Sequence, residues 1–179
     1  MQIQFYPYDF EYKVRDQKVY VHLYSKLETG ERICVVHQHQ PFFFAQVHAI
    51  DQTAVESKLK DLTLETKHEP AKVTSYQVVE KELLGKKEQF LKIYTNYPKA
   101  VPLISKELES WGIKCYEKDI LFIHRYLRDQ KITPLTLVRA EGELLDKTHL
   151  AVPIFKAQSV QDAGKEACEK WKILALDIE

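Results

Sequence analysis

Residues 89–116 read QFLKIYTNYPKAVPLISKELESWGIKCY, and this stretch decides the predicted fold class. Its first part, Gln89–Tyr94, predicts a strand, which the residues Asn96-Tyr-Pro98 interrupt. Apolar side chains then recur at the spacing of one helix face: Val101, Ile104, Leu108 and Trp111. Gly112 is well placed to end this helix, and residues 113–116 predict another strand. The order strand, helix, strand indicates an α+β arrangement.

The neighbouring segments extend this arrangement in both directions. Val73–Glu80 predicts a strand that turns at residues 83–87 into the strand at 89–94. Ile120–Asp129 predicts a second helix. Strand, strand, helix, strand and helix in this order resemble the RNA-recognition fold, so residues 73–131 are predicted to form such an α+β unit.

The first 50 residues have a different pattern, rich in β-branched and aromatic side chains. Strands are predicted at residues 2–8, 18–24, 32–39 and 41–47. Residues 1–50 are therefore expected to form an antiparallel β meander or small barrel. A short helix at residues 53–62 is expected to follow, because Val55, Leu59 and Leu62 fall on one face.

The segment after Ile132 contains weaker signals. Pro134–Ala140 predicts a strand, followed by a turn at Glu141-Gly-Glu143. Val152–Lys156 is consistent with a further strand, and residues 159–168 suggest a loop or a weak helix.

The final residues, Trp171–Glu179, read WKILALDIE. The apolar run Ile173–Leu176 predicts a buried strand. Residues two apart in a strand share a face, so Asp177 and Glu179 are expected to project together. Two adjacent carboxylates favour a cation between them, which indicates half of a magnesium or manganese site. The alternative is a strand that simply ends in polar residues.

Composition limits the classes of function. The chain has 26 basic and 26 acidic side chains and no formal net charge, so any contact with nucleic acid must come from a local patch. Three widely spaced cysteines argue against a disulfide framework and favour a reducing compartment. The N-terminus lacks the pattern of a signal peptide, and no apolar run approaches the length of a membrane span. We therefore expect a soluble, cytoplasmic protein without a membrane partner.

One block of the sequence, at residues 116–129, reads YEKDILFIHRYLRD and is followed by Ile132-Thr-Pro134. Further blocks are Gln40–Phe44, Leu83–Lys86 and Leu91–Tyr94, and the sequence given ends in Leu176-Asp-Ile-Glu179. In their order along the chain, these blocks resemble the N-terminal part of archaeal-type family B DNA polymerases. The ending resembles the first exonuclease motif of that family.

This resemblance implies a domain organisation. Residues 1–131 would be the polymerase N-terminal domain, and residues 132–179 would be the truncated start of a 3′–5′ exonuclease domain of the ribonuclease H type. Asp177 and Glu179 would be exonuclease ligands for Mg²⁺ or Mn²⁺ in a full-length parent. The remaining metal ligands would lie downstream, so the fragment alone is expected to be inactive and to carry no cofactor. Its expected partners are single-stranded template DNA and the remainder of the polymerase chain.

The resemblance also implies a pocket that senses uracil in the template strand. Such a pocket admits uracil and has no room for the methyl group of thymine. The matching positions are Tyr12, Pro41, Phe42, Phe90, Ile120, Leu121, Phe122 and Arg125. Three of them depart from the family pattern: Leu121 replaces a proline, Phe42 lacks a tyrosine hydroxyl, and Phe90 replaces a smaller aliphatic residue. The alternative is that these residues only pack a core.

Two other classes of function remain open on the sequence alone. The chain could be a free-standing module that binds single-stranded nucleic acid without catalysis. It could also be a purely structural domain with no contact to DNA.

Overall fold

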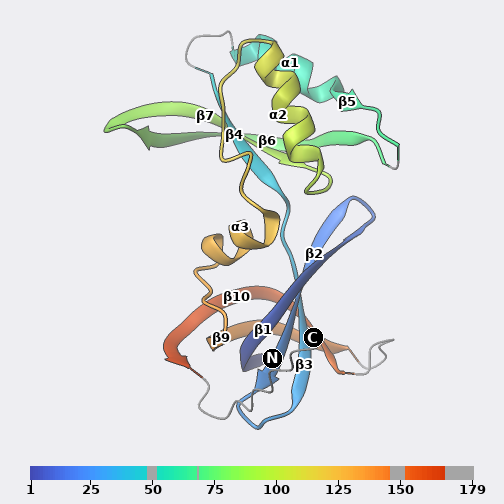
Figure 1. Ribbon diagram of the computed structural model, residues 1–179, viewed down its shortest axis with the longest axis vertical. Helices are drawn as coiled ribbons and strands as arrows, with labels where there is room; N and C mark the ends of the chain where they lie inside the picture. The colour runs from blue at the N-terminus through green and yellow to red at the C-terminus, as the bar shows by residue number, and fades with distance from the viewer. Residues whose placement is uncertain (48–51, 68, 146–151, 168–179) are drawn as a thin grey trace, which may run out of the picture. The chain divides into compact units, whose positions relative to one another are not determined.

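The computed structural model describes residues 1–47, 52–67, 69–145 and 152–167. Within these ranges the chain forms ten strands and three helices (Figure 1). It divides into two compact units. The first unit comprises Met1–Glu11, Val21–His37 and the described residues from Tyr126 onward. The second comprises Tyr12–Tyr20 and Gln38–Arg125.

The first unit is built on a closed barrel with the strand order β1-β2-β3-β10-β9. Strand β9 is antiparallel to both β1 and β10, whereas β10 runs parallel to β3. The strands are β1 (Gln2–Arg15), β2 (Lys18–Leu27), β3 (Arg32–Gln38), β9 (Thr136–Leu145) and β10 (Ile154–Ala167).

Alternation of side chains explains why these segments form a barrel. In β2 every second residue is buried, beginning with Val19, Val21 and Leu23, and the residues between them are more exposed. This period of two is typical of a strand with one face on a core. Phe5 and Phe155 are fully buried aromatic residues of the same unit.

Gly142 allows a close approach between β9 and β10. A Cβ atom placed on Gly142 would lie 2.0 Å from the main-chain oxygen of Lys156, which is shorter than any tolerated contact. The position also closes the barrel against β1, because Gly142 N donates to the oxygen of Met1 at 2.9 Å. Only glycine therefore fits at this position of β9.

Replacing Gly142 with alanine should lower the free energy of unfolding by about 1–3 kcal/mol, because the added methyl group forces β9 and β10 apart. Urea-induced unfolding followed by circular dichroism measures this loss. The control is Glu141→Ala, which changes an exposed neighbour in the same strand. Equal stability of the two variants would contradict the steric argument.

The second unit contains a five-stranded sheet with the order β5-β6-β7-β4-β8. Its successive elements β4, α1, β6, β7, α2 and β8 form a βαββαβ unit, with the short strand β5 added at the edge. The strands are β4 (Phe42–Gln46), β5 (Thr63–Leu64), β6 (Ala71–Leu83), β7 (Lys86–Thr95) and β8 (Cys115–Tyr116). The helices are α1 (Gln52–Asp61) and α2 (Ala100–Ser110), and α3 (Phe122–Asp129) follows β8.

The two faces of this sheet carry different clusters. On one face, Phe43 and Ile93 join a core with residues of α1 and α2, including Leu59 and Ile104. On the other face, the alternate residues Phe42, Phe44 and Phe90 form an aromatic cluster. Strand β4 is covered on both faces, which explains why its residues Phe42 to Ala45 are all buried.

The predicted fold class is confirmed: the fold is α+β, with a small barrel and a unit of the RNA-recognition type. The helix predicted after Pro98 is α2, and Gly112 follows its end with a φ of +81°. The predicted hairpin of residues 73–94 is formed by β6 and β7.

Three predictions are wrong in detail. The strand at 41–47 is not part of a meander, because β4 pairs with β7 and β8 in the second unit and supplies its first strand. The turn predicted at residues 141–143 lies inside β9, and most of the loop or helix predicted at 159–168 is strand β10. Pairing with β9 explains the last difference, because main-chain hydrogen bonds hold a polar segment whose side chains do not alternate clearly.

The strands β9 and β10 also lie differently from expectation. Both fall after Ile132, in the segment expected to begin a second domain, yet they complete the barrel with β1 and β3. Residues 168–179 lie outside the described residues, so their assignment to an exonuclease domain stays a prediction. Among the described residues, no helix is long and apolar enough to cross a membrane.

Candidate ligand pocket

A pocket of about 560 Å³ lies in the second unit, where the start of β4, the start of α2 and the segment leading into α3 meet. Seven of the eight residues predicted to form a uracil pocket line it. These are Tyr12, Pro41, Phe42, Ile120, Leu121, Phe122 and Arg125. The structure therefore brings together side chains from three separate stretches of the sequence.

Aromatic rings form the inner wall of the pocket. The rings of Tyr12 and Phe122 meet edge to face, with centroids 5.2 Å apart. Phe42 is buried, and the guanidinium carbon of Arg125 lies 4.4 Å from the centre of its ring. The ammonium of Lys92 contacts the same ring at 3.9 Å, although Lys92 does not line the pocket. Cations close to an aromatic face are attracted by its quadrupole.

Arg125 is the charged group of this wall. Only 3% of its side chain is exposed, and Nη1 lies 2.9 Å from Oε2 of Glu117. Nη2 donates a hydrogen bond to the main-chain oxygen of Glu117 at 2.7 Å. Nη1 is buried and makes no well-aligned hydrogen bond to any described residue. A buried N–H group of this kind can donate a hydrogen bond to the carbonyl oxygen of a ligand.

Leu121 lies at the rim of the pocket. The side chain of Leu121 is 68% exposed, whereas Phe122 immediately after it is buried. Leu121 directly precedes α3, and its main-chain oxygen accepts the first helical hydrogen bond, from Arg125 N at 2.9 Å.

Phe90 does not line the pocket. Its ring packs edge to face against Tyr116, with centroids 5.6 Å apart, and against Phe44 at 6.4 Å. This larger side chain does not fill the pocket, because Phe90 packs into the aromatic cluster on the sheet.

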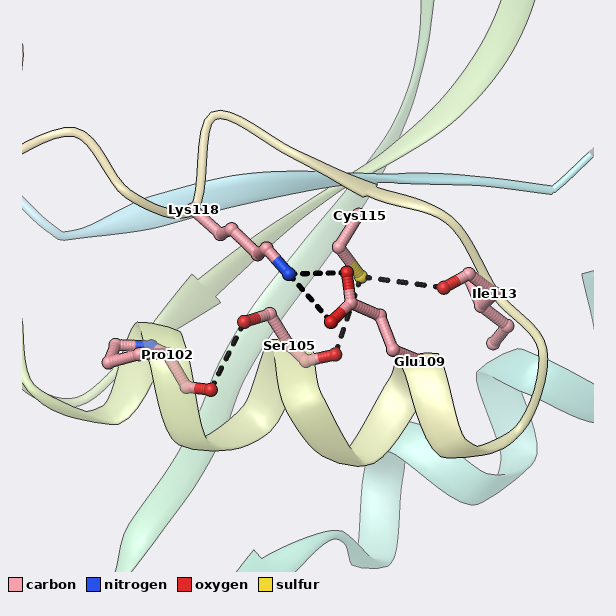
Figure 2. A network of polar contacts seen from close by, with 6 residues as sticks. All are labelled: Pro102, Ser105, Glu109, Ile113, Cys115 and Lys118. Atoms are coloured by element: carbon pink, nitrogen blue, oxygen red, sulfur yellow. Dashed lines mark hydrogen bonds and ion pairs between the residues drawn. The ribbon is translucent and has the colours of Figure 1, made fainter.

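Lys118 lines the pocket, but its ammonium is already engaged (Figure 2). It donates hydrogen bonds to both carboxylate oxygens of Glu109 in α2, at 2.5 and 2.6 Å. The hydrogen bond to Glu109 raises the pKa of Lys118. Because α2 and the segment before α3 are two walls of the pocket, this ion pair ties the walls together.

Cys115 belongs to the same network (Figure 2). Its Sγ lies 3.6 Å from the main-chain oxygen of Ser105 in α2 and 3.9 Å from that of Ile113. Burial raises the pKa of the Cys115 thiol to about 12, with Glu109 adding to the shift. The thiol is therefore protonated and inert at neutral pH.

We predict that Cys115 is alkylated by iodoacetamide far more slowly than an unfolded thiol at pH 8.5. The folded state holds the proton up to about pH 12, whereas an unfolded thiol titrates near its ordinary value of 9.0. Because burial disfavours the thiolate in the folded state, the free energy of unfolding should fall as the pH rises from about 9 towards 12 and should not change from this cause below that range. Site-resolved mass spectrometry, with and without urea, measures the rates. A rate unchanged by urea would contradict the prediction.

The predicted metal ligands Asp177 and Glu179 lie outside the described residues. Within the described part of the chain, no cluster of three or more histidine, cysteine, aspartate or glutamate side chains could hold a metal ion.

Sequence reasoning missed several residues of the site. Pro98, Lys99, Val101 and Pro102 at the start of α2, together with the segment from Lys118, complete the pocket lining. It also missed Glu117, which is the partner of Arg125. Glu117 lies within the YEKD block that carried the family resemblance, but nothing in its local sequence identifies the side chain that it contacts.

Comparison with solved structures identifies a protein that shares this fold. The chain superposes on the family B DNA polymerase from the hyperthermophilic archaeon Pyrobaculum calidifontis with a TM-score of 0.76 at 23% identity. The superposition covers 89% of this chain and 20% of the polymerase, so the two share a fold. No family model matches the chain.

Sequence comparison with curated proteins also identifies archaeal DNA polymerases as relatives. The chain is 26% identical over 171 residues to a DNA polymerase of Archaeoglobus fulgidus, covering 96% of this chain and 21% of the relative. It is 31% identical over 156 residues to a DNA polymerase of Methanocaldococcus jannaschii, covering 85% of this chain and 9% of the relative. The chain is therefore a homologue of archaeal family B DNA polymerases and corresponds to their N-terminal region. It spans about a fifth or less of the length of these relatives.

Proposed function

We propose that the chain binds single-stranded template DNA and holds a uracil base in the pocket lined by Phe42 and Arg125. This role belongs to a family B DNA polymerase whose remaining chain is its covalent partner. The observation that carries the proposal is the buried guanidinium of Arg125, whose Nη1 retains a donor beside apolar and aromatic walls. Pockets that bind small ligands combine such walls with a few placed polar groups.

The chemistry of uracil suits this arrangement. Its flat ring can lie against aromatic side chains, and its carbonyl oxygens can accept hydrogen bonds from a guanidinium. The pocket would discriminate against thymine because it has no room for the extra methyl group of that base. A difference of one methyl group in an apolar pocket is worth about 1–3 kcal/mol.

The three departures from the family pattern have different consequences. Phe90 belongs to the same aromatic cluster as Phe42 but does not itself line the pocket. The side chain of Leu121 is largely exposed, so a proline is not required there to fill space. The missing hydroxyl of Phe42 matters little if Arg125 supplies the polar contact, because Arg125 already lies over that ring.

The test is a fluorescence titration of the chain with labelled single strands that differ only at one uracil or thymine. We expect the uracil strand to bind about tenfold more tightly, the effect of a methyl group that does not fit. Affinity for both strands should fall as the salt concentration rises, because phosphate contacts release counterions. Equal affinities for the two strands would overturn uracil sensing while leaving template binding possible.

We also propose that Asp177 and Glu179 are metal ligands of a proofreading exonuclease, on the strength of their spacing and of the homology. A bound Mg²⁺ or Mn²⁺ would polarise the phosphodiester under attack. In a polymerase chain that continues past Glu179, Asp177→Ala should abolish proofreading and spare polymerisation. Electron paramagnetic resonance of Mn²⁺ offers a second readout: Asp177→Ala should weaken Mn²⁺ binding, and equal binding in both proteins would refute the assignment.

A free-standing module that binds single strands on its sheet is the alternative, since the βαββαβ unit resembles the RNA-recognition fold. Binding of that kind requires exposed rings on which bases can stack. Here Phe42, Phe44 and Phe90 are buried. The ammonium of Lys81 also lies 3.6 Å from the centre of the Phe44 ring. These observations favour the pocket over the open sheet face.

A further inference from the structure

We infer that Glu117 is a positioning residue, which holds the guanidinium of Arg125 at the pocket wall and thereby sets the affinity of the pocket for a base that offers a carbonyl oxygen to Arg125. Its effect on base preference rests on the function proposed above. Its effect on the geometry of Arg125 does not depend on that function.

Glu117 contacts Arg125 through two different groups. Its main-chain oxygen accepts a hydrogen bond from Nη2 at 2.7 Å, and its carboxylate Oε2 lies 2.9 Å from Nη1. Two contacts to two nitrogens of one planar group fix the position and the rotation of that plane. A guanidinium with one contact could turn about its bond to the side chain.

The other carboxylate oxygen of Glu117 binds a residue of the sheet. Oε1 of Glu117 accepts a hydrogen bond from Nζ of Lys81 in β6 at 2.8 Å. The ammonium of Lys81 in turn lies over the ring of Phe44 in β4. Lys81 therefore fixes Glu117 to the sheet. Through its contacts with Glu117, Arg125 is held in place relative to the sheet.

The backbone of Glu117 supports a specific role. Its φ is +57°, in the left-handed region that side chains other than glycine, asparagine and aspartate rarely adopt. Such a conformation persists only where the surrounding structure imposes it, and it is common at binding sites. Here it directs both the carbonyl group and the side chain of one residue towards the same arginine.

The arrangement leaves a donor for a ligand. A guanidinium carries five N–H donors, and the hydrogen bond to Glu117 uses one of those on Nη2. Nη1 is buried, pairs with the carboxylate only as an ion pair, and makes no hydrogen bond to a described residue. A base that presents a carbonyl oxygen to Nη1 would satisfy it.

The first experiment needs no ligand. We propose to compare the wild-type chain with Glu117→Gln by ¹⁵N nuclear magnetic resonance of the arginine side chains and by crystallography. Hindered rotation of the Arg125 guanidinium should be lost in the variant. Glu80→Gln is the control, since Glu80 pairs with Lys87 at 2.9 Å on the surface of the same unit. Arg125 signals that are identical in wild type and Glu117→Gln would overturn the inference.

The second experiment is a double-mutant cycle with strands that contain uracil or thymine. Glu117→Gln should weaken binding of the uracil strand about tenfold, the value of one hydrogen bond to a charged group, and leave the thymine strand unchanged, because the pocket excludes thymine. In the Arg125→Met background the same change should have no further effect, because Glu117 acts through Arg125. A separate loss in that background would contradict positioning and indicate a direct or purely structural role.

A second variant covers the case in which Glu117→Gln does not fold. Glu117→Asn tolerates the left-handed backbone and retains the main-chain acceptor, but its shorter side chain does not reach Nη1. It should lose the base preference in the same way. If wild type itself shows no preference while the Arg125 signals respond to Glu117→Gln, the proposed function fails and the positioning role stands.

Discussion

Replacing Phe43 with alanine is expected to remove about 3–5 kcal/mol from the free energy of unfolding. Phe43 is fully buried, and its strand β4 is central in the sheet, paired with β7 and β8. Its ring lies in the cluster between the sheet and the helices α1 and α2. Truncation would leave a large cavity with no polar group to attract water. Such a loss is a large part of the total stability of an ordinary domain.

Urea-induced unfolding monitored by circular dichroism and by tryptophan fluorescence measures this effect. Trp111 packs against the same cluster and reports on the second unit. Phe43→Leu is the matched control, because it retains most of the apolar volume and should lose less than half as much. A loss below about 1 kcal/mol for the alanine variant would show that β4 is not the central packed strand described above.

Replacing Arg125 with methionine should weaken binding of uracil-containing single strands by about tenfold, which is the whole of their expected advantage over thymine. A hydrogen bond from a charged group is worth about 1.5–3 kcal/mol, which is enough for this loss. Methionine retains an apolar body against Phe42 but has no N–H donor. Glu117 would keep its ion pair with Lys81 at 2.8 Å, so its carboxylate would not be left without a partner.

The matched control is Lys92→Met. Lys92 and Arg125 both place a cation on the ring of Phe42, but only Arg125 lines the pocket. Fluorescence titration should therefore show a large loss for the arginine variant and a small one for the lysine variant. Equal losses would mean that charge near the ring, rather than a contact inside the pocket, controls binding.

Local patterns in the sequence were sufficient for most of the elements. The helical spacing of Val101, Ile104 and Leu108 predicted α2, and Gly112 predicted its end. The alternation in residues 18–24 predicted β2. These patterns work because they arise from neighbours along the chain, which occupy the same face of one element.

Reasoning from the sequence predicted only part of the pocket. Family resemblance identified seven residues that do line it, because they lie in short stretches that match the family position by position. It also named Phe90, which lies elsewhere, since resemblance transfers a position and not the direction in which a larger ring packs. Glu117 could not be identified as the partner of Arg125, because seven residues of loop and helix lie between them and no periodicity relates the two.

The sequence by itself determined most of the strands and helices before Ile132, the apolar face of α2, and which polymerase region the chain resembles. Only the tertiary structure decided that β4 leaves the meander for the second sheet, and that β10 closes the barrel beside β3. The physical reason is the range of the interactions. Periodicity is set within one element, whereas strand pairing joins residues more than 100 positions apart, as in the pairing of Cys34 with Ile154. Which of the possible pairings forms depends on the packing of the whole core and on the loops that must close around it.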